Sequence, residues 1–187
     1  MTEFVPHAEI PAVIVVKPKR FGDDRGYFEE TFVSRRYADN GISCVFVQEN
    51  HSLSAKCGVV RGLHFQIPPH AQDKLVRCTR GRVLDIAVDI RTDSNTFGKY
   101  VAVELSAANG FQLFVPKGFA HAFCTLEENC EVQYKVSDYY APECDAGIAF
   151  NDKDVGIDWP FSEDQLTLSD KDKSHPMLSE YKSPFVC

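Results

Sequence analysis

The 187-residue sequence has no apolar run approaching the roughly 18 residues that a membrane helix needs, so we expect no membrane-spanning segment. Its first residues lack the basic segment and apolar stretch of a secretory signal. The seven cysteines are odd in number and include no CxxC pair. Reduced, mostly buried thiols of this kind are typical of a cytoplasmic protein, which is the location that we expect.

Positive charge is also scarce: 20 Lys and Arg residues stand against 27 Asp and Glu residues, for a net charge of −7. This balance argues against a nucleic acid or an anionic membrane as the main partner, although a local basic site for a phosphorylated ligand is still compatible with it. The chain contains no glycine-rich phosphate loop, no dinucleotide fingerprint and no G-x-S-x-G motif. These absences argue against nicotinamide chemistry and against a serine nucleophile.

Helical patterns are almost missing, whereas short strand-like segments recur between glycine and proline corners. This pattern is typical of an all-β sandwich or barrel. The clearest helix signal is SRRYADNGI at residues 34–42, which Asn-Gly ends. With no repeat and no linker, residues 1–187 are predicted to form a single domain.

Residues 58–91 carry the strongest pattern and are predicted to form three strands. Strict alternation in VVRGLHFQ places His64 and Gln66 on one face and Arg61 on the other. Lys74 follows after the IPPH turn. An unpaired polar group in an apolar setting costs roughly 2–7 kcal/mol, so three such side chains within one hairpin favour a polar ligand cavity.

The later segments supply further strands. YVAVEL and FQLFV are predicted to form a hairpin through SAANG, in which Asn109-Gly110 provides the turn. The strand after VPKGF carries His121, and EVQYKV carries Tyr134 between two valines. Near the N-terminus, FGDDRGYFEETF is predicted to be a polar turn that ends in aromatic residues.

These polar residues suit proton-transfer chemistry, although each has an ordinary structural explanation when taken alone. His64 can act as a general base, Lys74 can stabilise negative charge on a substrate oxygen, and Tyr134 can donate a proton. A base, an acid and a cation around one pocket suit proton abstraction next to a carbonyl. A histidine base benefits from a carboxylate partner. The candidates for that carboxylate are Asp85, Asp89, Asp170 and Asp172.

A metal site is the weaker interpretation of the same stretch. Metal-binding cupins use an H-x-H pair with a further carboxylate or amide and a distant histidine. The matching tripeptide here is His64-Phe65-Gln66, with only one histidine, and His121 is the candidate distant ligand. We therefore expect no metal.

Several motifs together resemble one known family. They are VVRGLHFQxPPxAQxKLVRC, GxVxDxAVDIRxxSxTFGK, VPxGFAHAF, YKxxDYYxPE and LSxKD, with FGDDRGYFEETF and FVQENHS nearer the N-terminus. In order and spacing they resemble the dTDP-4-dehydrorhamnose 3,5-epimerase family over about the whole chain.

This resemblance implies a cupin-type jelly-roll barrel with a ligand cavity inside the barrel and short peripheral helices. It implies a homodimer that works without metal or organic cofactor. The implied substrate is a dTDP-linked 4-keto-6-deoxy sugar, dTDP-4-dehydro-6-deoxy-D-glucose, which is inverted at C3 and C5 to give dTDP-4-dehydro-L-rhamnose for dTDP-L-rhamnose biosynthesis.

The resemblance also assigns roles to residues. His64 is the base, Asp172 rather than Asp170 is its carboxylate partner, Tyr134 is the proton donor, and Lys74 lies by the C4 oxygen. The implied substrate-binding residues are Arg61 and, from the partner subunit, Arg25 at the diphosphate, Glu30, Gln48 and Asn50 at the nucleotide, Tyr140 beside the base, His121 as a second pocket histidine, and Asp145 and Lys171 as weaker contacts.

Two alternatives remain open. One is a related cofactor-free epimerase that acts at one carbon only, or on another nucleotide-linked 4-keto sugar. The other is a non-catalytic cupin that binds a sugar nucleotide or a metal. The complete set of His64, Lys74 and Tyr134 argues against the second, since a binding protein has no need for an acid and a base.

Overall fold

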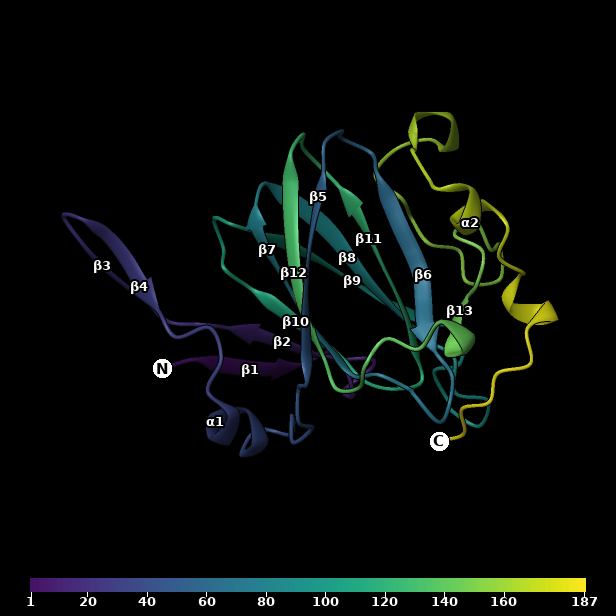
Figure 1. Ribbon diagram of the computed structural model, residues 1–187, viewed down its shortest axis with the longest axis horizontal. Helices are drawn as coiled ribbons and strands as arrows, with labels where there is room; N and C mark the ends of the chain where they lie inside the picture. The colour runs from purple at the N-terminus through teal and green to yellow at the C-terminus, as the bar shows by residue number, and fades with distance from the viewer.

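The computed structural model describes residues 1–187 and consists almost entirely of antiparallel strands (Figure 1). A six-stranded sheet has the order β1-β2-β10-β7-β12-β5, and a five-stranded sheet has the order β13-β6-β11-β8-β9. The strands are β1 (Glu3–Pro6), β2 (Ile14–Lys17), β3 (Arg20–Asp23), β4 (Gly26–Glu29), β5 (Gln48–Ser54), β6 (Val60–Gln66), β7 (Lys74–Arg80), β8 (Arg82–Asp89), β9 (Tyr100–Ser106), β10 (Gln112–Val115), β11 (Phe119–Thr125), β12 (Cys130–Val136) and β13 (Asp145–Gly147).

Helix is limited to short pieces at the periphery. The α-helices are α1 (Ser34–Ala38), where the sequence predicted one, and α2 (Asp170–Lys173); the 3₁₀ turns are η1 (Pro142–Cys144), η2 (Glu163–Gln165) and η3 (Leu178–Glu180). No helix has both the length and the apolar content that crossing a bilayer requires. The expectation of an all-β jelly roll with short peripheral helices is confirmed.

Consecutive strands repeatedly change sheets, which corrects two expected hairpins. β6 lies in the five-stranded sheet and β7 in the six-stranded sheet, and β9 and β10 are divided in the same way. The SAANG segment does turn, since the Gly110 amide donates to the Ser106 carbonyl, but the turn leads from one sheet to the other. In both pairs the chain crosses from one sheet to the facing sheet, and such crossings are typical of a jelly roll.

The space between the two sheets holds the larger apolar core. It includes Val76 and Val132 from the six-stranded sheet and Ala87 and Leu105 from the five-stranded sheet, all of them at most 1% exposed. Each fully buried valine or leucine side chain contributes about 1.5–3 kcal/mol, so this core fixes how the sheets face each other.

The outer face of the five-stranded sheet is also covered. Ile86 and Val88 of β8 pack there with Ile148 and Phe185 of the C-terminal segment. Figure 1 shows this segment running beside β6 with α2 at its side. The packing therefore brings residues near position 170 against a strand more than one hundred positions earlier in the chain.

The segment expected to be a polar turn forms a separate two-stranded hairpin, β3–β4. Figure 1 shows it projecting away from the two main sheets. Phe21, Tyr27 and Phe28 on this arm are 53%, 59% and 67% exposed. Three exposed aromatic side chains on a projecting hairpin are typical of a surface that contacts another protein.

Candidate active site

A cavity of about 530 Å³ lies between the sheets, and a neighbouring one of about 350 Å³ adjoins it. Both are lined by His64 on β6, Lys74 on β7, Tyr134 on β12 and Lys171 on α2. The site therefore draws on both sheets and on the C-terminal segment. His64 lies on one wall and Tyr134 on the other, because their strands belong to opposite sheets.

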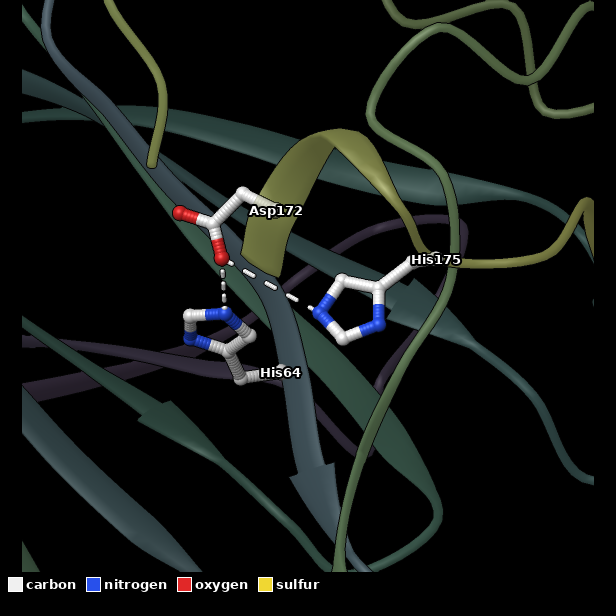
Figure 2. Close-up of side chains that lie close together, drawn as sticks. All are labelled: His64, Asp172 and His175. Carbon is white, nitrogen blue, oxygen red and sulfur yellow. Dashed lines mark hydrogen bonds and ion pairs between the residues drawn. The ribbon is translucent and has the colours of Figure 1, made fainter. Parts of the chain in front are cut away.

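His64 on β6 and Asp172 on α2 form a close ion pair at the cavity. The His64 Nε2 atom lies 2.6 Å from Asp172 Oδ1 (Figure 2). Because a carboxylate only accepts, Nε2 carries the proton in the neutral imidazole and Nδ1 keeps the lone pair. Ser169 caps α2 by accepting a hydrogen bond from the Asp172 amide, which helps to fix the carboxylate.

The Asp172 carboxyl group is ionised more readily than usual. Burial alone would raise its pKa, but the hydrogen bond and charge interaction with His64 outweigh burial and hold the pKa of Asp172 below its ordinary value. The side chain of Asp172 is 5% exposed, whereas that of His64 is 31% exposed. The pair thus joins a buried anion to an imidazole that faces the cavity.

Lys74 is buried at the start of β7, and its Nζ atom donates to the His64 carbonyl at 3.1 Å. Burial lowers the pKa of the Lys74 ammonium to about 8, although the negative charges of Asp85 and Asp145 oppose this shift. A lysine of this kind is a cation at neutral pH with an unusually weak hold on its proton.

Tyr134 has a protonated phenol at neutral pH. Burial raises the pKa of Tyr134, and the positive charge of Arg61 offsets only part of this effect. The residue sits between β5 and β7 in the sheet, opposite Asn50 and Val76. Its side chain lines both cavities.

A second histidine–aspartate pair stands at the wall of the larger cavity, which its histidine, His121, lines. His121 Nε2 is 3.0 and 3.1 Å from the two carboxylate oxygens of Asp85, and both residues are buried. Asp85 was one of four candidate partners for His64; the structure pairs it with His121 instead. Asp89 is bound to Arg91, and Asp170 is exposed, which leaves Asp172 at His64.

The prediction that Arg61 and His64 lie on opposite faces of β6 is wrong, because both side chains line the same cavity. The pairing of β6 with β11 shifts register between His121 and Phe123, so strict alternation fails at this point. Gly62 lies in the shifted part with φ +137°, and a Cβ atom there would be 2.3 Å from the Ala122 Cβ. Only glycine fits at that position.

The smaller cavity contains further residues that the sequence singled out. Gln48 donates to Asn50 at 2.9 Å, and the Tyr140 hydroxyl donates to Asp145 at 3.2 Å. The Asp145 carboxylate raises the pKa of Tyr140, and Lys171 forms an ion pair with the same carboxylate. These residues build a polar wall beside His64.

Arg25 and Glu30 line neither cavity of the chain. Arg25 lies at the tip of the β3–β4 arm and pairs with Asp23. Glu30 follows the arm directly and bonds to Arg36 at 3.0 Å. Within one chain, the structure does not bring these two residues to the other candidates.

His175 lies beside His64 and Asp172, and no sequence pattern singled it out. Its Nε2 atom lies 3.9 Å from Asp172 Oδ1, and its ring meets that of His64 edge-on at 5.6 Å between centroids (Figure 2). Burial first, and then the charge of His64, lower the pKa of His175. The available signal was its spacing of three residues from Asp172, which places both on one side of a helical turn.

The metal ligands considered from the sequence, His64, Gln66 and His121, do not form one ligand group. Gln66 uses its amide in hydrogen bonds to the His70 and Tyr139 carbonyls and to the Ala141 amide, and His121 is bound to Asp85. The one group of three metal-ligating side chains whose ligand atoms all lie within 4.8 Å of one another is His64, Asp172 and His175.

Known proteins resemble the chain over nearly its full length. The family model for dTDP-4-dehydrorhamnose 3,5-epimerase matches residues 7–180. A dTDP-4-dehydrorhamnose 3,5-epimerase of Escherichia coli K12 is 52% identical over 94% of the chain and 95% of its own length.

Solved structures share the fold. The dTDP-6-deoxy-D-glucose-3,5-epimerase of Legionella pneumophila in complex with dTDP-4-keto-L-rhamnose superimposes with a TM-score of 0.92 at 42% identity, covering 97% of the chain and 95% of that protein. A 3'-monoepimerase of Streptomyces bikiniensis in complex with dTDP-quinovose has a TM-score of 0.85 at 31% identity, covering 94% and 87%. The jelly roll is therefore of the cupin type found in these epimerases.

Proposed function

Because the chain belongs to the dTDP-4-dehydrorhamnose 3,5-epimerase family, we propose that it inverts C3 and C5 of dTDP-4-dehydro-6-deoxy-D-glucose and yields dTDP-4-dehydro-L-rhamnose, for dTDP-L-rhamnose biosynthesis. The observation that supports this most is the placing of His64, with Asp172 behind it, across one cavity from Tyr134. The reaction moves protons only, so this chain's own acid, base and cation account for each step.

The first step is removal of a proton next to the C4 ketone. His64 takes this proton on Nδ1, the atom that its bond to Asp172 leaves with a lone pair. The imidazolium that forms is stabilised by the Asp172 carboxylate, which stays ionised.

Negative charge then develops on the C4 oxygen as the enolate forms. Lys74 is the buried cation of the cavity, and its ammonium next to His64 is placed to stabilise that oxygen. In a buried site such a charge acts more strongly than in water.

The last step returns a proton to carbon from the opposite face. Tyr134 projects from the sheet that faces His64, and its phenol is protonated at neutral pH. A base and an acid on opposite walls invert a carbon, whereas one group acting alone returns the proton to the face it left. Repeating the cycle at the second carbon gives the double epimer.

The remaining cavity residues bind the substrate in this proposal. Arg61 meets the diphosphate, and the cluster beside it holds the sugar and nucleotide. That cluster comprises His121, Gln48, Asn50, Tyr140, Asp145 and Lys171.

The active form is a homodimer in this proposal, with the β3–β4 arm of one subunit entering the site of the other. Two observations support it: the arm projects with exposed aromatics, and Arg25 and Glu30 lie outside their own cavity (Figure 1). A closed two-fold dimer exchanges the same arm in both directions. The enzyme acts in the cytoplasm, a compartment that keeps its seven free cysteines reduced.

A mixed dimer tests the exchanged arm. Subunits with His64→Ala and subunits with Arg25→Ala are combined under two affinity tags, and only mixed dimers are collected. One of their two sites is then complete, so they should show about half of wild-type activity, well above either parent. Mixed dimers no more active than the parents would show that Arg25 serves its own subunit or none.

The reaction itself is tested by NMR of the dTDP keto sugar in deuterated buffer. Label entering both C3 and C5, followed by the rhamno product, is the expected result. Label and inversion at one carbon only would establish the single-carbon alternative, whose solved example shares the fold at lower identity. No exchange at either carbon would leave the protein a binder of sugar nucleotides.

A further inference from the structure

His175 carries a mostly buried imidazole for which the proposed reaction has no use. Its side chain is 11% exposed, and its Nε2 atom is buried without a hydrogen-bond partner. The nearest carboxylate oxygen, on Asp172, is 3.9 Å away, which is too long for a hydrogen bond. A buried polar atom left unpaired costs about 1–3 kcal/mol, so an atom placed like this calls for a partner that the protein itself does not provide.

The donor atoms of His64, Asp172 and His175 are close enough together for one metal ion, all within 4.8 Å of one another. In a tetrahedral zinc site with bonds of about 2.0–2.2 Å, neighbouring ligand atoms lie about 3.2–3.6 Å apart. Asp172 Oδ1 is 2.6 Å from His64 Nε2 and 3.9 Å from His175 Nε2, so the observed separations bracket that value. Figure 2 shows both rings turned toward the same carboxylate.

We propose that His64, Asp172 and His175 together bind Zn²⁺ as an inhibitory ion. Two imidazoles and a carboxylate are a ligand set that zinc accepts, and three protein ligands leave a fourth position for water. His64 and Asp172 both line the larger cavity, so the ion's position borders it. The 2.6 Å contact between His64 Nε2 and Asp172 Oδ1 has to open to about 3.2 Å for the ion to enter.

The inhibitory effect follows from the tautomer of His64, and this part rests on the proposed function. In the free protein Nε2 carries the proton and Nδ1 the lone pair. When zinc takes Nε2, a neutral imidazole must carry its proton on Nδ1 instead, so no proton is released and none can be accepted. The ion also occupies Asp172, so the base loses both its lone pair and its counter-charge.

Calorimetric titration with ZnCl₂, in buffer with a non-chelating reductant, tests the site without reference to activity. The variant is His175→Gln, and the matched control is His51→Gln, which breaks a similar pair of histidine and carboxylate, with Glu131, at an exposed position. Loss of an outer-shell partner of a metal already costs 10–100-fold in affinity, so His175→Gln should weaken zinc binding by at least about tenfold. Wild type and His51→Gln should each bind one zinc ion, with the same high affinity.

Equal zinc affinity in wild type and His175→Gln would overturn the proposal. A thermal melt of His175→Gln establishes that the variant is folded before the comparison. Cobalt(II) supplies a second readout on wild type alone: intense visible absorption of four-coordinate Co²⁺ is expected, and weak octahedral absorption contradicts the site.

Solvent exchange into the keto sugar then measures inhibition, with each variant normalised to its own rate in a chelator. Zinc should stop exchange in wild type, a chelator should restore it, and His175→Gln should need at least about ten times more zinc. Zinc that binds without slowing exchange would refute the inhibitory role. If chelated wild type shows no exchange, the proposed function fails, while the calorimetry still decides the metal site.

Discussion

Two histidines of the cavity wall, His64 and His121, each pair with an aspartate, and the settings of the two pairs differ in almost every respect. His64 and His121 are directly opposed residues of β6 and β11. The side chain of His64 is 31% exposed and that of His121 is 8% exposed. Asp85, the partner of His121, comes from the adjacent strand of the same sheet, whereas Asp172, the partner of His64, comes from a short helix in the C-terminal segment.

The comparison separates two uses of one chemical pair. The pair of His121 and Asp85 is enclosed by the sheet, so it is suited to hold a fixed dipole and charge. The pair of His64 and Asp172 opens onto the cavity, so its imidazole can reach a substrate proton and be protonated. Five predictions test this division, beginning with the largest effect.

Replacing the open histidine should remove catalysis. His64→Ala should lower the rate of epimerisation by about 10²–10⁴-fold, the usual effect of losing a general base, while thermal stability and dTDP binding stay close to wild type. NMR of product formation and a thermal melt measure the two. Activity within a few-fold of wild type would mean that His64 is a structural residue like His121.

Removing the acid on the facing wall should separate exchange from inversion. Tyr134→Phe keeps the ring and loses the phenol, so inversion should fall by a factor similar to that of His64→Ala. His64 can still remove a proton and return one to the same face, so deuterium exchange should fall much less. An equal fall in exchange and inversion would show that Tyr134 is more than the opposite-face donor.

Asp172→Asn should slow turnover while Asp170→Asn, two residues away, leaves it nearly unchanged. A hydrogen bond to a charged group contributes about 1.5–3 kcal/mol, so its loss slows the reaction by roughly 10–100-fold. The control is exposed and touches neither cavity. Steady-state kinetics with the reverse ranking would place the dyad elsewhere.

Part of the fold and of the site could be predicted from the sequence. His64, Lys74 and Tyr134 could be found because each interrupts an apolar strand, and the strands themselves follow from alternation and turn residues. The all-β architecture follows from the same signals. The carboxylate could not be found this way, because Asp172 is 108 positions from His64 and four aspartates were equivalent candidates. Only the family resemblance separated them.

Two local features were not available from periodicity. Arg61 reaches the cavity through a register shift, which depends on how β11 pairs with β6 rather than on the residues of β6 alone. The turn residues at Asn109-Gly110 fix a turn but not its destination, because a chain can turn within a sheet or pass to the facing one. Both features depend on which strands become neighbours, and that is decided by the whole fold.

Breaking the enclosed pair should affect stability more than chemistry. Asp85→Asn removes a charged acceptor that is fully buried against His121, so the free energy of unfolding should fall by roughly 1–3 kcal/mol. Denaturant unfolding measures this value, with Asp172→Asn as the matched change in the open pair. A larger loss of stability in Asp172→Asn would reverse the division of roles between the pairs.

The smallest effect concerns pH and links the enclosed pair to the reaction. Burial lowers the pKa of Lys74 to about 8, so the ammonium is charged below this pH and neutral above it. Activity should therefore decline as the pH rises through about 8, because the enolate loses its cation. Asp85 opposes this shift through its negative charge, so Asp85→Asn should lower the pKa of Lys74 further and move the alkaline decline to lower pH. Rates of solvent exchange between pH 6 and 10 measure both the decline in wild type and its displacement in Asp85→Asn, since exchange requires the enolate but not Tyr134. Lys74→Arg, which stays charged throughout this range, is the control, and its rates should show no alkaline decline near pH 8. A decline that does not move in Asp85→Asn would mean that the enclosed pair holds His121 in place and does nothing for the charge on Lys74.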